Sequence, residues 1–231
     1  MKSREVVAWV AVTIVVGLWL DMAVPVYGQW MTNAGVFCVF AYVLRRSSRS
    51  EARTLWIGLV IGFLGELFLC FGWGLYTYRY ENLPLFVPPG HALLFFAGTK
   101  AGAWVPRWFP AVVCVGFMLV VLIAAGIYGY TSEVLWFGLF GVAFIIGRDR
   151  QVYSVMLVMA LALELLGTYW GAWKWAPEVN GLGLPSLNPP LTAGVFYCWL
   201  DLMVLGLGRA LDRLFPEGIF KNVFRKAAGM F

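Results

Sequence analysis

The chain has 231 residues, of which 61% are hydrophobic and only 13% are charged, and its mean hydropathy is +0.80. A soluble domain carries about 25% charged residues, so this composition excludes an ordinary water-soluble globular protein. The net charge of +5 does not indicate nucleic-acid binding, because the basic residues stand in short loops between apolar runs and not on one water-facing surface.

Eight apolar runs follow one another along the chain. A helix needs about 20 apolar residues to cross a hydrocarbon core of about 30 Å, and eight such helices with short loops use nearly the whole sequence. The first run follows Lys2 and Arg4 but is long and lacks a clear small-residue cleavage site, so we expect a retained span and not a signal peptide. The pattern predicts an all-α integral membrane protein of the cell membrane, with about eight transmembrane helices. The runs cover residues 6–24, 31–44, 54–75, 89–105, 109–127, 132–147, 152–171 and 190–208.

The basic residues give an independent prediction of orientation. With the N-terminus in the cytoplasm and eight spans, the inner side holds all of the 17 Lys and Arg residues except Arg79 and Lys174. Cytoplasmic loops of membrane proteins carry such an excess of positive charge, so we expect both termini to be cytoplasmic. Lys100 then lies where its side chain reaches the inner surface and needs no special role.

Residues 1–208 are expected to form a single transmembrane domain, and residues 209–231 a basic cytoplasmic tail. The tail mixes apolar and basic residues around Pro216, a pattern typical of a partly helical segment that lies on the inner membrane surface. A frayed cationic tail that only sets topology fits the same pattern.

The four cysteines all lie inside apolar runs. There is no CxxC pair and no Cys/His cluster, so neither a disulfide framework nor a zinc site is predicted. Buried cysteine usually acts as a small hydrophobic residue, and we expect that role here. The residues are Cys38, Cys70, Cys114 and Cys198.

Two segments, residues 66–92 and 164–193, share one order of features. Each has an acid in a span, then Gly-x-aromatic-x-aromatic, then Leu-Pro-x-x-x-Pro-Pro before the next span. The shared order predicts two repeats of four helices, at about residues 6–105 and 109–208. Because four is an even number of spans, the repeats are parallel and related by a pseudo-two-fold axis along the membrane normal.

The shared features have simple physical roles. The aromatic residues fall at the outer membrane–water boundary, where Trp and Tyr rings are favoured. Proline is tolerated in the first turn of a helix, so the two Pro-Pro pairs are expected to open the fourth and eighth spans. The loops before these pairs either fold inward as a lid over a cavity or form simple anchored turns.

Three acids are predicted near the middle of the bilayer. Glu66 and Glu164 lie about 12 residues into their spans and Asp201 about 11, at a rise of about 1.5 Å per residue. A carboxylate at that depth costs a few kcal/mol, so it faces the bundle interior, pairs or stays protonated. The acids serve either as proton donors in a cavity or as hydrogen bonds between helices. Asp21 and Glu133 are expected near outer span ends, where solvent reaches them, and are weaker candidates.

His91 is the only histidine and follows Pro88-Pro89-Gly90, whereas the matching residue of the second segment is Thr192. This asymmetry makes His91 a candidate acid/base or orienting group near the mouth of a cavity. An interfacial histidine with satisfied hydrogen bonds is the simpler alternative.

The motif order resembles that of small integral-membrane isoprenoid enzymes. In the lycopene cyclase domain, an acid in a span is followed by Gly-x-Trp-x-aromatic and a Pro-containing loop, and residues 164–192 look like that pattern. Residues 66–91 look like a sister copy. The membrane carotenoid hydratases have a similar signature, and small fungal meroterpenoid cyclases pair an early acid with one in the last span, as Glu66 and Asp201 do. The cyclase domain has paired acids after its loop proline, where this chain has Pro-Pro.

The resemblance implies an intramembrane enzyme that protonates a lipophilic isoprenoid or polyene, for cyclisation, hydration or isomerisation. Glu66 and Glu164 would be the proton donor and its partner, with Asp201 stabilising positive charge and His91 assisting. No metal or nucleotide cofactor is implied, since no ligand cluster or phosphate-binding loop is present. The aromatic residues expected to line the cavity and bind the substrate are Trp73, Tyr76, Tyr78, Trp170 and Trp173.

Two other functions fit the same features. Repeats and midplane acids also serve a proton-coupled transporter or lipid carrier. A non-catalytic membrane assembly subunit, with structural acids, is the third. The expected partners are the lipid bilayer and a lipophilic small molecule, with a homo-oligomer or a membrane partner left open.

Overall fold

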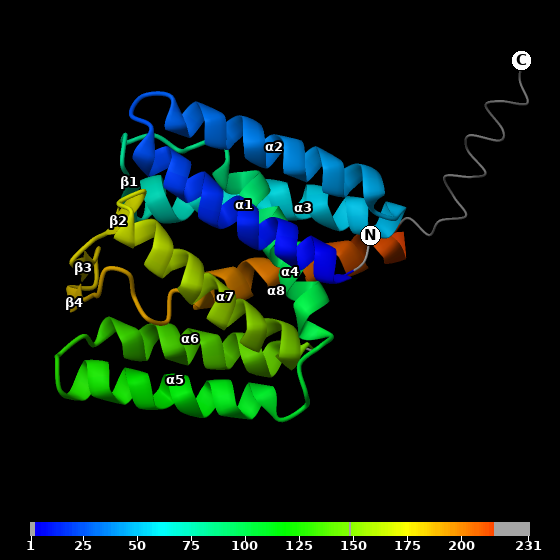
Figure 1. Ribbon diagram of the computed structural model, residues 1–231. Coiled ribbons are helices and arrows are strands. Elements are labelled where there is room, and N and C mark those ends of the chain that lie inside the picture. The colour runs from blue at the N-terminus through cyan, green and yellow to red at the C-terminus, as the bar shows by residue number, and fades with distance from the viewer. Residues whose placement is uncertain (1–2, 148, 215–231) are drawn as a thin grey trace, which may run out of the picture.

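The computed structural model describes residues 3–147 and 149–214, and this part of the chain forms eight α-helices (Figure 1). Each helix overlaps one of the eight expected runs, so the all-helical prediction is confirmed. The predicted tail lies outside the described residues beyond residue 214, and the last helix continues six residues past the expected domain boundary. The helices are α1 (Ser3–Ala23), α2 (Gly28–Arg46), α3 (Arg49–Glu66), α4 (Val87–Gly102), α5 (Phe109–Gly126), α6 (Ser132–Ile146), α7 (Arg150–Tyr169) and α8 (Gly194–Leu214).

Five helical segments among the described residues are long and apolar enough to cross a membrane. They are α1, α3 with its π-helical continuation η1 (Leu67–Gly72), α5, α7 and the first 18 residues of α8. α4 and α6 are shorter, with 16 and 15 residues, and α2 opens with the polar sequence Gly-Gln-Trp-Met-Thr-Asn. Five such helices indicate a membrane protein.

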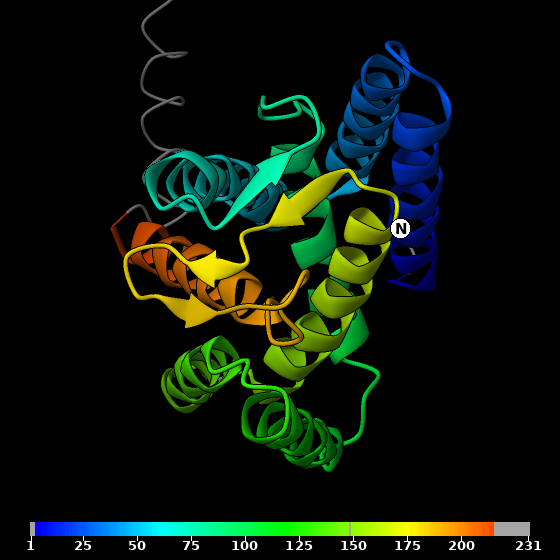
Figure 2. The ribbon, with the colours of Figure 1, turned by 90° about the vertical axis from the view of Figure 1, so that its left-hand side faces the viewer.

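The helices lie side by side in one bundle (Figure 1). The α1–α2 hairpin and the α5–α6 hairpin are on opposite sides, and α4, α7 and α8 lie between them (Figure 2). α3 packs against α4 and α8, while α7 packs against α8 and α4. The first and last described residues are at one end of the bundle, opposite the end that carries the strands.

Two short antiparallel sheets interrupt the helical pattern and were missed by the all-α prediction. β1 (Tyr76–Tyr78) pairs with β2 (Trp173–Trp175), and β3 (Glu178–Val179) pairs with β4 (Leu184–Pro185). A glycine with positive φ precedes each strand of the first sheet, Gly74 at +73° and Gly171 at +66°. Only glycine adopts this conformation without strain, so it turns the chain out of the preceding helix and into the strand.

The aromatic residues of these strands do not form an interfacial belt, and that expectation is wrong. Successive side chains of a strand point to opposite faces. Tyr76 and Tyr78 are therefore buried together while Thr77 between them is exposed, and Trp173 and Trp175 are buried on either side of exposed Lys174.

The prolines begin one helix as expected but not the other. Pro88 and Pro89 lie in the first turn of α4, where a missing N–H has no intrahelical partner to lose. Pro190, in contrast, precedes the first residue of α8 by four positions. The Glu133 carboxylate accepts hydrogen bonds from the backbone N–H groups of Leu191 and Thr192, at 2.8 and 3.0 Å, and holds this segment outside the helix.

At the end of the bundle opposite the strands, α3 and α4 are tied together. Ser48 and Glu51 form a reciprocal capping box at the start of α3. Glu51 Oε1 also accepts a hydrogen bond of 2.5 Å from Lys100 Nζ, near the end of α4. The cation of Lys100 is thus paired with an acid on the neighbouring helix.

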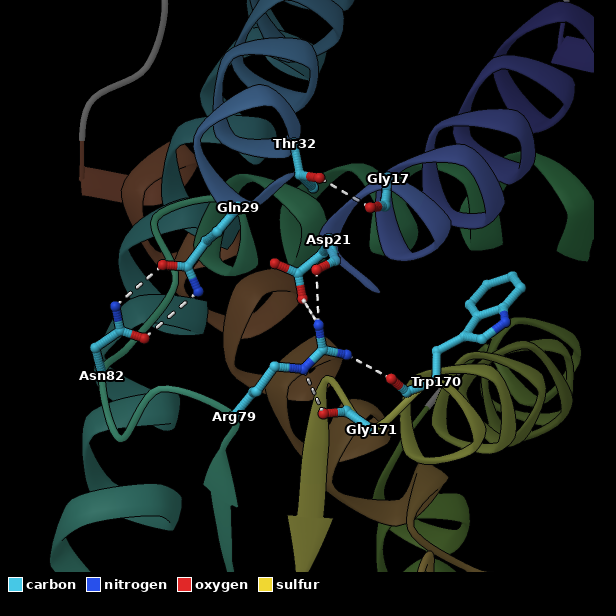
Figure 3. Close-up of polar contacts among 8 residues, drawn as sticks. All are labelled: Gly17, Asp21, Gln29, Thr32, Arg79, Asn82, Trp170 and Gly171. Atoms are coloured by element: carbon cyan, nitrogen blue, oxygen red, sulfur yellow. Dashed lines mark hydrogen bonds and ion pairs between the residues drawn. The ribbon is translucent and has the colours of Figure 1, made fainter. Parts of the chain in front are cut away.

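At the strand end, Arg79 joins α1 to α7 (Figure 3). Its guanidinium donates to the carbonyl oxygens of Asp21 at 2.7 Å and Gly171 at 3.0 Å, and to that of Trp170. The Asp21 carboxylate is 3.7 Å away. The last carbonyls of a helix have no intrahelical donor, so one cation satisfies the ends of two helices at once.

We predict that Arg79→Ala destabilises the fold by about 2 kcal/mol or more, because part-buried carbonyl oxygens left without a donor cost about 1–3 kcal/mol each. Thermal unfolding of the purified chain in detergent measures the effect. Lys174→Ala is the matched control, since Lys174 is an exposed cation on the adjoining strand. Equal unfolding midpoints for the two variants would contradict this role of Arg79.

Candidate functional site

A cavity of about 70 Å³ lies between α1, α2, α4, α7 and the paired strands β1 and β2. Most of its wall is hydrocarbon. Glu66 and Glu164, far apart in the sequence, both line it. The other lining residues are Val10, Thr13, Ile14, Gly17, Leu18, Thr32, Val36, Tyr76, Tyr78, Phe86, Val87, Gly90, His91, Leu93, Leu163, Trp173, Trp175 and Tyr197.

Glu66 is the last residue of α3, where the helix widens into the π-helical turn η1. Such turns are rare in proteins as a whole, and those that occur are often found at functional sites. Oε2 of Glu66 accepts hydrogen bonds from the hydroxyls of Tyr76 at 2.8 Å and Tyr78 at 2.6 Å. Oε1 is 2.6 Å from Nε2 of His91, which comes from the first turn and a half of α4. Glu66 therefore has three partners around one buried carboxyl group.

Glu164, on α7, has an arrangement of the same kind. Its Oε2 accepts hydrogen bonds from the indole N–H groups of Trp173 at 2.7 Å and Trp175 at 2.9 Å. Its Oε1 accepts a hydrogen bond of 2.9 Å from the hydroxyl of Tyr197 on α8. Each acid is thus held by two aromatic donors from the strand that follows its own helix, and by one group from a neighbouring helix.

The pairing of β1 with β2 brings the two acids to one place. Tyr76 lies opposite Trp175 and Tyr78 opposite Trp173. The Tyr76 and Trp175 rings are 4.8 Å apart between centroids. The Gly-x-aromatic-x-aromatic spacing is therefore what a strand needs to direct two aromatic donors to the same face, toward the acid 9 to 12 residues earlier in the chain.

The donors offset the cost of burying a carboxyl group among hydrocarbon. Glu66 and Glu164 are 5% and 4% exposed, and an unpaired charge in such a position would be strongly unfavourable. Burial raises the pKa of the Tyr76 and Tyr78 phenols well above their usual range, as does the Glu66 carboxyl group beside them. Both hydroxyls therefore keep their protons and remain donors across the physiological pH range.

The two acids differ in the group that reaches Oε1. An imidazole nitrogen donates or accepts according to its protonation, so His91 can exchange a proton with Glu66. Trp173 and Trp175 can only donate a hydrogen bond, so neither indole can accept one from Glu164. The His91 and Tyr197 rings meet edge to face with centroids 5.1 Å apart, and so connect the surroundings of the two acids.

The structure separates the sequence-predicted site residues into two groups. Glu66, Glu164, His91, Tyr76, Tyr78 and Trp173 line the cavity, whereas Trp73, Trp170 and Asp201 do not. Trp73 and Trp170 each precede the positive-φ glycine, which reverses the chain and leaves them outside. Trp73 instead donates a hydrogen bond of 2.9 Å to the carbonyl oxygen of Asn180. The expectation that these two rings form cavity walls is wrong.

Asp201 is only 2% exposed and lies one helical turn beyond Tyr197 on α8. Its Oδ2 atom has no hydrogen-bond partner among the described residues. Because Asp201 is absent from the lining of the cavity, the expectation that it stabilises charge on a substrate there is corrected.

Sequence reasoning missed Trp175 and Tyr197 as site residues. Trp175 carried a signal, because it is the second aromatic residue of the repeated motif and matches Tyr78. Tyr197 carried none, since a tyrosine in an apolar helix has many roles and only the packing of α7 on α8 brings it to Glu164.

Asp21 and Glu133 were expected to be accessible to solvent, but both are buried, with exposures of 2% and 0%. The segment before α8 covers Glu133, which accepts hydrogen bonds from both the backbone N–H and the hydroxyl of Thr192. Asp21 lies beneath the Arg79 side chain. Both acids connect segments of the fold and lie outside the cavity lining.

Comparison of the chain with protein-family models, with curated proteins and with solved structures finds no match. Within residues 3–147 and 149–214, no three His, Cys, Asp or Glu side chains are grouped so as to hold a metal ion. The geometry of the two acids and their cavity is therefore the basis for assigning a function.

We predict that Gly167→Ala disturbs this site. A Cβ atom there would lie 2.0 Å from the indole ring of Trp173, forcing the ring away from Glu164. Overpacking of this kind costs about 1–3 kcal/mol, measurable as a lower thermal unfolding midpoint in detergent. Gly138→Ala on α6 is the matched control, because nothing lies within 4 Å of its Cβ position. A midpoint for Gly167→Ala no lower than the control's would contradict this close approach.

Proposed function

We propose that the chain is an intramembrane enzyme that protonates a lipophilic isoprenoid or similar polyene and so drives its cyclisation, hydration or isomerisation. One observation supports this above all: two hydrogen-bonded carboxyl groups face a single hydrocarbon-walled cavity. An apolar wall suits a substrate that is mostly hydrocarbon, and an acid in such a wall meets its substrate with little competing water.

In this proposal the helices cross the cell membrane eight times as two parallel repeats, with both termini cytoplasmic. The charge distribution supports this topology, as does the position of the two described chain ends at one end of the bundle. In two such repeats α3 corresponds to α7 and α4 to α8. The packing of α3 on α8 and of α7 on α4, together with the pairing of β1 with β2, fits a pseudo-two-fold relation between them. α4 is short for a span but is buried along most of its length, so its neighbours face the lipid in its place.

The reaction begins with the pair formed by Glu66 and His91. His91 supplies a proton to Glu66 across their 2.6 Å contact, and the carboxyl group passes it to a double bond of the polyene. A C–H bond forms, the π electrons of the double bond are consumed, and a carbocation remains on the substrate. Loss of a proton from carbon to the Glu66 carboxylate ends an isomerisation or cyclisation, and addition of water followed by loss of its proton to the same carboxylate ends a hydration.

Glu164 has the complementary part. In the ionised form its charge would be stabilised by the two indole donors and would face the cation that develops in the cavity. The rings of Tyr76, Trp173 and Trp175 also line the cavity, where aromatic faces attract positive charge. The role that sequence reasoning assigned to Asp201 thus passes to Glu164.

We predict that Glu66→Gln and Glu164→Gln each lower product formation by at least about 100-fold, the lower bound for removing a positioned general acid or a preorganised charge. The chain and its variants are expressed in cells that make candidate isoprenoids, and the extracted lipids are analysed by liquid chromatography and mass spectrometry. Glu178→Gln is the matched control, because Glu178 is exposed and outside the cavity.

Unchanged product in the Glu66→Gln, Glu164→Gln double variant would eliminate this mechanism. Substrate that crosses the membrane without chemical change, and stops doing so in Glu66→Gln, would replace the enzyme with a transporter.

A further inference from the structure

The cavity reaches the surface of the bundle between α1 and α7. Its lining includes Thr13 and Ile14 on α1 and Leu163 on α7, all of which are only half-buried. Figures 1 and 2 both show α1 and α7 side by side along one side of the molecule. Both helices are among those long and apolar enough to span a membrane, so this opening faces lipid.

Two other approaches to the cavity are closed. At the strand end, Arg79 joins the ends of α1 and α7 and the β1–β2 pair covers the space between (Figure 3). On the far flank of α1, Thr32 on α2 donates a hydrogen bond of 2.8 Å to the carbonyl oxygen of Gly17. The two helices lie so close there that a Cβ at Gly17 would be 3.0 Å from the Thr32 side chain. These contacts close the strand end and the flank toward α2, which favours the side between α1 and α7 as the route of a ligand.

The walls also limit the shape of the ligand. The volume of about 70 Å³ corresponds to about five water-sized spaces, since one water needs about 10–15 Å³ on this measure. Such a space suits one extended chain and is too narrow for the two acyl chains of a phospholipid. Thr32 already donates its hydroxyl hydrogen and the Tyr and Trp donors are engaged by Glu66 and Glu164, so few polar groups remain for a hydrophilic ligand.

We propose that the ligand is a single-chain lipophile that enters from the bilayer between α1 and α7 to reach Glu66 and Glu164. This inference rests on the function proposed above, to which it adds the route and the shape of the substrate. Ile14 and Leu163 form the two sides of this lateral opening.

The test is photolabelling of the full chain in phosphatidylcholine vesicles with hexadecanol that carries a diazirine, followed by mass spectrometry of the labelled residues. In the unmodified chain we expect label on the buried cavity residues Val10 and Leu93. The label on these residues should fall about tenfold in the Ile14→Trp, Leu163→Trp double variant, because the two indole rings fill the space between α1 and α7 through which the ligand enters.

The matched control is the Val12→Trp, Leu165→Trp double variant. These positions lie on the same two helices but are 54% and 47% exposed and do not line the cavity. Its label on Val10 and Leu93 should stay within twofold of the unmodified chain. If the Ile14→Trp, Leu163→Trp protein does not fold, each single variant is compared with its own neighbour, Val12→Trp or Leu165→Trp.

Cavity label that survives tryptophan at both Ile14 and Leu163 would overturn the lateral route. No cavity label in the unmodified chain, or equal cavity label from a two-chain phosphatidylcholine diazirine, would overturn the single-chain ligand. Labelling requires no reaction, so it can succeed where the Glu66→Gln and Glu164→Gln variants show the proposed chemistry to be wrong. Conversely, if product forms but the tryptophans leave the cavity label unchanged, the proposed chemistry stands and the lateral route is wrong.

Discussion

A carboxyl group buried in hydrocarbon requires hydrogen-bond partners, and the architecture of this protein provides three for each of two acids. Glu66 and Glu164 cannot obtain them from their own helices, whose backbone N–H groups are engaged. Each obtains two from the strand that follows it in the chain. The π-turn after α3, the positive-φ glycines and the pairing of β1 with β2 all act to bring those donors back to the acids.

The strand end of the bundle follows from the same requirement. The last carbonyl oxygens of α1 and α7 have no intrahelical donors, and Arg79, the residue after β1, satisfies them. This contact closes the cavity at that end, and the proposed route of the ligand runs between α1 and α7 instead. The segment that contains β1, β2 and Arg79 therefore provides the hydrogen bonds of the acids and also closes one end of their cavity.

The sequence was sufficient to predict the helices because lipid requires long apolar runs, and each of the eight runs is a helix in the structure. It also singled out Glu66, Glu164 and His91, since ionisable residues are rare among such runs. It was insufficient for the aromatic residues. The sequence around Tyr78 and Trp173 is typical of a membrane interface, and only the pairing of their strands, 95 residues apart in the chain, turns the side chains inward. Asp201 was misplaced for a related reason: depth along a helix follows from counting, but the direction of a side chain depends on its neighbours.

Glu66 and Glu164 have similar surroundings but different third partners, and in the proposed reaction this difference sets the direction of proton transfer. His91 beside Glu66 provides a ring nitrogen that can donate or accept, whereas the indoles beside Glu164 can only donate. In the proposed reaction, the proton passes from His91 through Glu66 to the substrate, and the charge that it creates there faces Glu164. The edge-to-face contact of His91 with Tyr197 keeps these two unlike halves at a fixed separation across one cavity.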